Sequence, residues 1–226
     1  DMCSLMDIDT KPSFKPLHRH FQDELDLINK YQCNWIFDVS NQWLPVVGLS
    51  KATDWLQSYL KSRTEFGNYD VNRYVYLTTN SITQETAPLL KQAGVKVAYV
   101  GIDGWDRSTL TALHKTHSGP QQMLKAARDA GIHIRTSLVI GAGLTKDNLV
   151  TLPEFVSEIS SEFGDTILSW GNFLEIILPG SPVWYDFQKF AYIECITEAK
   201  ILYELFDKKG FLTWVQQEKL TELYIR

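Results

Sequence analysis

Two apolar runs with a helical segment between them constrain the fold of this chain more than any other feature. The first run is V-K-V-A-Y-V-G-I-D from Val95, and the second is I-H-I-R-T-S-L-V-I-G from Ile132. The segment between them ends at Gly131, a residue typical of helix C-termini. The pattern is typical of a βαβ unit, whose two strands lie parallel in one sheet.

Five strand-like segments alternate with helical patterns along the chain. The strand-like runs lie at 34–39, 71–77, 95–103, 132–140 and 173–178, and two terminal helices are predicted near 193–207 and 213–224. This alternation predicts an α/β fold with a parallel sheet and right-handed crossovers. The helices can line one face, as in a barrel, or both faces, as in an open doubly wound sheet.

Capping residues predict where several helices begin. Pro16 suits a first-turn position, Ser50 and Thr145 are candidate N-caps, and Ser81 with Gln84 has capping-box spacing. No linker or low-complexity tract divides the sequence. We therefore predict one domain, with a core in residues 1–190 and a helical extension in residues 191–226.

Composition indicates a globular protein in a reducing, cytoplasmic setting. The 226 residues are 44% hydrophobic and 22% charged, with a net charge of −5 and three dispersed cysteines. No apolar run is long enough to span a membrane, no signal peptide opens the chain, and no basic run indicates nucleic-acid binding. Because the first residue is Asp1, we expect further residues upstream in the full protein.

Two common functional motifs are not supported. The G-A-G after Ile140 begins a dinucleotide-binding pattern, but the position of its third glycine is Lys146. A tight glycine turn is the simpler interpretation. The five histidines form no metal-ligand set; His20 is expected to be solvated on a helix, and His133 to lie on a strand surface. No serine has the G-x-S-x-G context of a hydrolase nucleophile.

Polar residues gather toward the ends of four successive predicted strands. Because ligands bind at the carboxyl ends of parallel strands, we expect these side chains to share one ligand site. An arginine among them could bind a carboxylate. The residues are Ser40, Asn41, Thr79, Asn80, Asp103, Arg135 and Ser137.

The order of four motifs resembles the radical S-adenosylmethionine (radical SAM) superfamily. They are I-F-D-V-S-N-Q-W from Ile36, G-V-K-V-A-Y-V-G-I-D from Gly94, A-G-I-H-I-R-T-S-L-V-I-G from Ala130 and L-P-G-S-P-V-W-Y from Leu178. The likeness covers most of residues 1 to 187. It implies a partial TIM-like (β/α) barrel that carries S-adenosylmethionine and a 4Fe-4S cluster.

The defining C-x-x-x-C-x-x-C motif of that superfamily is not present in full. Cys3, preceded by Met2, matches its third cysteine, so the resemblance implies that the chain starts inside the cluster loop and lacks the first strand. A cluster needs its full set of thiolates. We therefore expect none to assemble on this polypeptide as given.

Site residues follow from the resemblance by position. It assigns Ser40 and Asn41 to the cofactor amine, Arg135 and Ser137 to polar positions where an arginine pairs with the cofactor carboxylate, and Ile140 and Gly141 to packing against adenine. Asp103 stands where the family often has glutamate. Thr79 and Asn80 complete the predicted cofactor site, and Cys3 is the predicted metal ligand.

The function implied is that of a radical SAM enzyme core that generates a deoxyadenosyl radical, acting on an unidentified small-molecule or peptide substrate. A degenerate, cluster-free barrel that binds a nucleoside or a partner protein is the alternative. An ordinary TIM-barrel lyase or aldolase is a third interpretation. It requires a lysine or a carboxylate set at the strand ends, and the sequence supplies neither.

Overall fold

The computed structural model describes residues 15–40, 42–44, 49–67, 69–105, 110, 120–140 and 146–174. Five strands alternate with helices along this part of the chain. The strands are β1 (Trp35–Phe37), β2 (Asn72–Leu77), β3 (Val95–Asp103), β4 (His133–Ile140) and β5 (Ile167–Leu174). The helices are α2 (Leu17–Tyr31), α3 (Leu49–Phe66), α4 (Thr86–Gln92), α6 (Pro120–Ala130) and α7 (Lys146–Phe163), with a short 3-10 turn, η1 (Thr79–Ser81).

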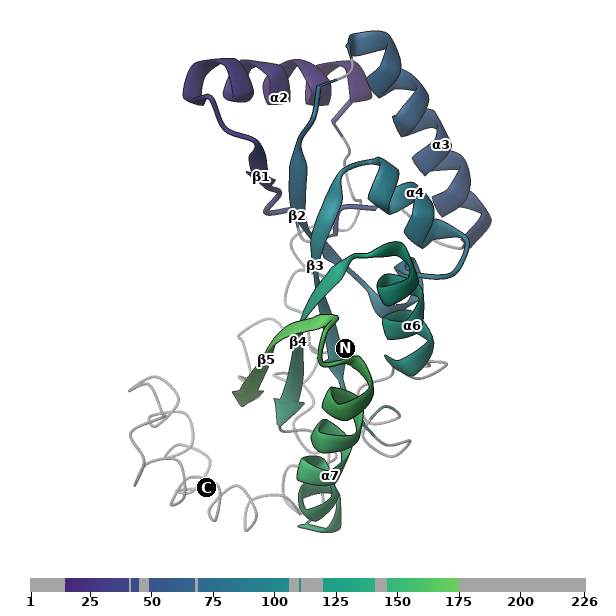
Figure 1. Cartoon of the computed structure of the whole chain (residues 1–226), viewed down its shortest axis with the longest axis vertical. Helices are drawn as coiled ribbons and strands as arrows, with labels where there is room; N and C mark the ends of the chain where they lie inside the picture. The colour runs from purple at the N-terminus through teal and green to yellow at the C-terminus, as the bar shows by residue number, and fades with distance from the viewer. Residues whose placement is uncertain are drawn as a thin grey trace, which may run out of the picture.

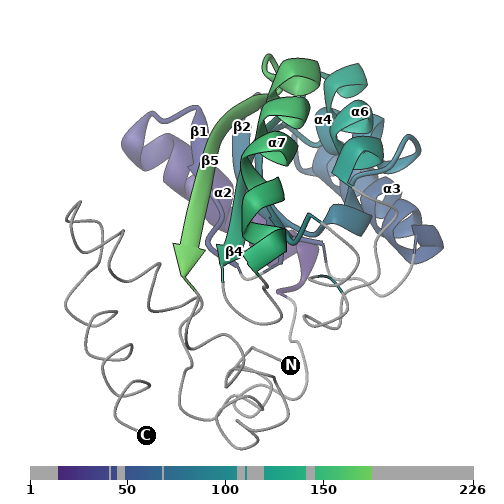
Figure 2. The same cartoon turned by 90° about the horizontal axis from the view of Figure 1, so that it is seen from below.

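The strands form one parallel sheet in the order β1-β2-β3-β4-β5. Each strand pairs with the one before it, so the sheet grows in a single direction. Right-handed crossovers then place every connecting helix on the same face. Figure 1 shows α3, α4, α6 and α7 along one side of the sheet, and Figure 2 shows the same arrangement from below. The predicted α/β fold is confirmed, and the one-sided, partial-barrel arrangement is the correct one.

The last strand differs from its prediction. It begins at Ile167, whereas the sequence pattern placed a strand at 173–178, and residues after 174 lie outside the described part. Ser169 and Gly171 interrupt the apolar run, and glycine inside a strand weakens the sequence signal. Pairing with β4 along its length decides the strand instead.

Two predicted helix starts are also wrong. Ser50 lies inside α3, which begins at Leu49, and Ser81 belongs to η1. At α4 the capping exchange occurs two residues later, between Thr83 and Thr86. The Thr86 backbone N–H donates to Thr83 Oγ1 at 3.2 Å, and the Thr83 N–H donates to Thr86 Oγ1 at 2.9 Å. Either hydroxyl satisfies a backbone donor that the first turn leaves unpaired.

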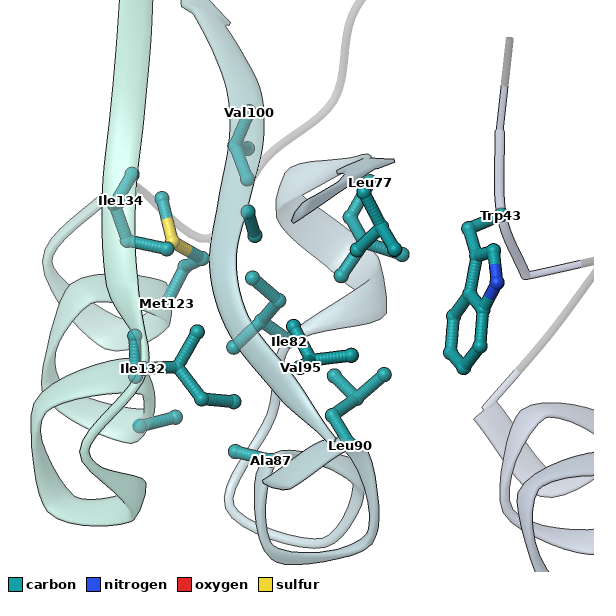
Figure 3. Packing of buried hydrophobic residues seen from close by; sticks show 14 of the residues in the cluster. Trp43, Leu77, Ile82, Ala87, Leu90, Val95, Val100, Met123, Ile132 and Ile134 are labelled. Atoms are coloured by element: carbon teal, nitrogen blue, oxygen red, sulfur yellow. The ribbon is translucent and has the colours of Figure 1, made fainter. Parts of the chain in front are cut away.

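The core lies between the sheet and its helices. Alternate residues of the strands point to the helices and are fully buried, among them Val75, Val100 and Ile134. They pack on the apolar sides of α4 and α6, represented by Leu90 and Met123 (Figure 3). Since one face of the sheet supplies this core, the intervening residues on the other face do not pack against these helices.

A buried ion pair attaches α2 to the amino-terminal end of β2. Arg73 forms a bidentate salt bridge to Glu24, and its Nη2 lies 2.8 Å from Glu24 Oε2. Arg73 Nε donates to the Ala93 carbonyl at 2.8 Å, and the Tyr69 hydroxyl donates to Glu24 Oε2 at 2.6 Å. The charges are therefore both paired and hydrogen-bonded, as buried charges must be.

His20 completes this buried network, contrary to the expectation that it is solvated. Its Nε2 lies 3.1 Å from Glu24 Oε1, and its ring makes an edge contact with Tyr59. Burial alone would raise the pKa of the Glu24 carboxyl. Hydrogen bonds from His20 and Arg73 outweigh that effect and lower the Glu24 pKa to about 2. His133, in contrast, is exposed on β4 as predicted.

We expect Arg73→Met to reduce the free energy of unfolding by about 3–5 kcal/mol, because it leaves the Glu24 carboxylate buried without its partner. Urea unfolding followed by circular dichroism measures the change. Lys125→Met is the matched control, since Lys125 pairs with Asp129 on the surface, where an ion pair contributes about 0–1 kcal/mol. Equal effects of the two substitutions would contradict the assigned role of Arg73.

Acid sensitivity should depend on Glu24. Its folded-state pKa of about 2 lies below the ordinary value of 4.5, so its contribution is full above about pH 4.5 and is lost as the pH falls toward 2. The shift corresponds to about 3 kcal/mol. Unfolding free energies measured from pH 7 to pH 2.5 should fall less steeply for Glu24→Gln than for the unmodified protein. Parallel curves would show that Glu24 is not the group responsible.

Candidate functional site

The face of the sheet opposite the helices carries side chains in rows, set by the parallel register. One row joins Phe37, Tyr74, Val97 and His133 across β1 to β4. The next row, nearer the carboxyl ends, joins Tyr76, Tyr99, Arg135 and Ser169 across β2 to β5. The third row contains Gly101, Ser137 and Gly171. The residues change from aromatic to small toward the carboxyl ends of the strands.

Four aromatic rings of the first two rows form a continuous surface, which we call the aromatic platform: Phe37, Tyr74, Tyr76 and Tyr99. Phe37 stacks on Tyr74 with ring centroids 4.6 Å apart, and Tyr76 lies 5.2 Å from Tyr99. Phe37 is 50% exposed, and the three tyrosines are partly exposed. The platform is therefore available to contact another molecule.

The row of small residues lies between the aromatic platform and the carboxyl ends of the strands. Gly101 and Gly171 flank Ser137, whose side chain is buried. In a typical barrel such rows are filled by bulky branched side chains. Small residues here replace the bulky side chains of such a row, and the Asp103 carboxylate lies against one of them, Gly101.

Asp103 ends β3 in a left-handed backbone conformation, with φ of 65°. Few residues other than glycine adopt this region, because Cβ crowds the following carbonyl. The conformation folds the carboxylate back over Gly101, where an added Cβ would lie 2.7 Å from Asp103 Oδ1. The glycine is thus required by the position of the carboxylate. Backbone strain of this kind is often found at functional sites.

The first two strands contribute further polar groups at the same edge. After β1, the Ser40 hydroxyl and backbone N–H both hydrogen-bond Asp38 Oδ1, at 2.6 and 2.9 Å. After β2, η1 holds Thr79 buried and Asn80 exposed. The structure therefore places Ser40, Thr79 and Asn80 just beyond the strands and Asp103 at the last position of β3.

Arg135 lies lower on the sheet than the sequence argument assumed. It is the third residue of β4 and precedes Leu138, the partner of Asp103, by three residues, or about 10 Å of extended strand. Its Nε donates to Ser169 Oγ at 3.1 Å, and its guanidinium carbon lies 5.8 Å from the Tyr74 ring centroid. Arg135 therefore lies beside the aromatic platform. Its pairing with a cofactor carboxylate stays a prediction.

Several predicted residues lie outside the described part of the chain: Cys3, Asn41, Gly141, the turn at 178–185 and the two terminal helices. Ile140 is the last residue of β4. Among the described residues, no three His, Cys, Asp or Glu side chains are grouped so that they could hold a metal ion. No helix in the described ranges is long and apolar enough to cross a membrane.

The four residues of the aromatic platform were not among the site residues predicted from the sequence. Tyr74 and Tyr76 flank Val75 in β2, and Tyr99 follows Ala98 in β3, so alternation with buried residues was visible. The predicted site rested on the polar residues at the ends of the strands. The exposed side of each strand could have been identified from this period of two.

We expect Asp103→Gly to be more stable than Asp103→Ala by about 1 kcal/mol, because glycine adopts a φ of 65° without the penalty that Cβ brings. Thermal unfolding of the two variants measures the difference. Both lack the carboxylate, so the comparison isolates the backbone. Equal stabilities, or a more stable alanine variant, would contradict the strained conformation of this residue.

No protein-family model and no curated protein matches this chain. Solved structures do resemble it. The radical S-adenosylmethionine methyltransferase TsrM from Kitasatospora setae, with cobalamin and a 4Fe-4S cluster bound, matches 82% of this chain with a TM-score of 0.57 and 17% identity. The cobalamin-dependent S-adenosylmethionine radical enzyme OxsB, with aqua-cobalamin and S-adenosylmethionine bound, matches 78% with a TM-score of 0.59 and 13% identity.

A third similar structure is coproporphyrinogen III oxidase (HemN) from Escherichia coli, described as a radical SAM enzyme. It matches 75% of this chain with a TM-score of 0.51 and 13% identity. The chain spans only 32%, 31% and 40% of the lengths of TsrM, OxsB and HemN. At these identities the likeness shows the fold: this chain is a partial (β/α) barrel structurally similar to radical SAM enzymes.

Proposed function

We propose that this chain is the part of a radical SAM enzyme that binds S-adenosylmethionine, at the carboxyl edge of β1 to β4. The observation that carries the proposal is the strained Asp103, whose carboxylate lies over Gly101 at this edge. The structural likeness to three radical SAM enzymes supports it.

The residues at this edge fit the chemistry of the cofactor. S-adenosylmethionine carries an ammonium group, a sulfonium cation and ribose hydroxyls, all of which a carboxylate can attract or accept from. Asp103 supplies that carboxylate, and Ser40 and Asn80 add neutral polar groups. The row of small residues Gly101, Ser137 and Gly171 lies beside this edge.

The described part of the chain does not contain the cysteine ligands that an iron–sulfur cluster requires. Such clusters are held by several cysteine thiolates, and the cysteine that the structure describes, Cys33, lies two residues before β1 and donates to the Leu27 carbonyl. Cys3 matches one position of the cluster motif by sequence. We propose that residues upstream of it supply the other cysteines in the full protein.

Radical chemistry would come from the cofactor and the cluster together, while the protein orients reactants and excludes side reactions. The task of this chain's own residues is positioning. Asp103 holds the cofactor at the edge, and the polar groups of Ser40 and Asn80 lie at the same edge.

Asp103→Asn should weaken S-adenosylmethionine binding by about 1.5–3 kcal/mol, because it removes a charged hydrogen-bond acceptor while keeping the shape of the side chain. Isothermal titration of the full protein measures the affinity. Asp129→Asn, on the exposed surface of α6, is the matched control and should change nothing. An unchanged affinity in Asp103→Asn would reject the assigned site.

The full-length protein, including residues upstream of Asp1, should bind about four iron and four sulfide ions per chain after anaerobic reconstitution, as expected for one 4Fe-4S cluster. With a reductant it should convert S-adenosylmethionine to 5′-deoxyadenosine. Cys3→Ala is expected to abolish both. Cofactor binding without iron would favour the cluster-free, nucleoside-binding scaffold instead.

A further inference from the structure

The aromatic platform and Arg135 form a surface that the cofactor site does not use. The platform lies one to two rows below Gly101 and Ser137, toward the amino-terminal ends of the strands. Its rings are partly exposed although they lie near the middle of a sheet, where a fully packed barrel would cover them. Exposed aromatic rings in a continuous array are typical of surfaces that contact a ligand.

Among the described residues, Arg135 supplies a positive charge beside the platform. Arg135 is exposed, its Nε is fixed by Ser169 Oγ, and its guanidinium faces the Tyr74 ring. No carboxylate pairs with it among the described residues; its partners there are the neutral Ser169 hydroxyl and the Tyr74 side chain. A guanidinium whose orientation is fixed in this way presents its remaining N–H groups in the fork that binds a carboxylate or phosphate.

We propose that the platform and Arg135 bind a planar aromatic molecule that carries an anionic group. The ring would stack against the partly exposed faces of Tyr76 and Tyr99, and the anion would accept hydrogen bonds from the terminal nitrogens of Arg135. The inference that this molecule is the substrate rests on the proposed function. The inference that it binds here does not depend on that function. The location one row below Gly101 would bring the ligand next to the cofactor edge.

Alternative ligands fit less well. A cation would face Arg135 at close range, and like charges repel at such distances. An aliphatic anion would satisfy the arginine but would lose the stacking that four rings offer. A neutral aromatic ring would leave the desolvated guanidinium without a counter-charge, which is costly when water is displaced. Planarity and negative charge are thus both required.

The test uses three probes on the full chain without iron or S-adenosylmethionine: 2-naphthoate, the neutral 2-naphthalenemethanol and the non-planar cyclohexanecarboxylate. Isothermal titration should show saturable binding of 2-naphthoate, at least tenfold tighter than either other probe. This comparison needs no variant, so it decides the inference even where a substitution impairs folding. Equal affinities for the three probes, or no binding of 2-naphthoate, would overturn it.

Variants then assign the contacts. Arg135→Met should weaken 2-naphthoate at least tenfold and leave 2-naphthalenemethanol within twofold, whereas Tyr99→Leu should weaken both aromatic probes. Lys125→Met, an exposed charge on α6, is the control. A separate titration of Arg135→Met with S-adenosylmethionine tests the other assignment of this arginine, to the cofactor carboxylate. A loss of cofactor affinity in Arg135→Met would instead assign this arginine to the cofactor and overturn the inference.

The two proposals can fail independently. If Asp103→Asn binds S-adenosylmethionine normally while 2-naphthoate binding depends on Arg135, the cofactor site is wrong and the platform site remains. If cofactor binding depends on Asp103 but 2-naphthoate does not bind, the cofactor site remains and the platform inference is rejected.

Discussion

The single direction in which the sheet grows is the constraint on which the rest of this structure depends. Each strand adds beside the previous one, so every right-handed crossover returns on the same side. One face of the sheet therefore carries the four crossover helices that the structure describes, together with the hydrophobic core. The other face is free of the demand to pack against them, and this freedom allows rows of aromatic, small and charged residues to occur there.

Polar groups are distributed unevenly between the two faces. On the helix side, the Glu24 and Arg73 charges are buried as a pair in which both side chains are also hydrogen-bonded to neighbouring groups. On the opposite side, Arg135 has a neutral acceptor and an aromatic ring but no anion in the described part of the chain. The buried pair stabilises α2 against β2, while the exposed arginine is suited to an incoming ligand. The two arginines, Arg73 and Arg135, thus differ in role because their side chains lie on opposite faces of the sheet.

The sequence predicted the helices and strands better than it predicted the contacts between them. Periodicity and helix-stop glycines located β2, β3, β4 and the helices between them, because those signals are local. The start of β5 was missed, since Ser169 and Gly171 obscure a strand that pairing with β4 stabilises. The strand-end residues Thr79 and Asp103 were found because chain order alone places them at or after the end of a strand. The position of Arg135 along the strand direction was not predicted correctly. It depends on the pairing register, and register is a property of pairs of strands.

Gly94 shows how little sequence variation the start of β3 can accept. A Cβ there would overlap the Val71 carbonyl oxygen, and its φ of 95° is a conformation that side-chain-bearing residues rarely adopt. The Gly94 carbonyl also accepts a hydrogen bond from the Arg73 N–H at 2.8 Å. In a saturation-mutagenesis library this position should be depleted of every substitution, whatever function is selected. Depletion at such a site reports folding, so it provides the baseline against which substitutions at Asp103 and Arg135 can be read as effects on binding.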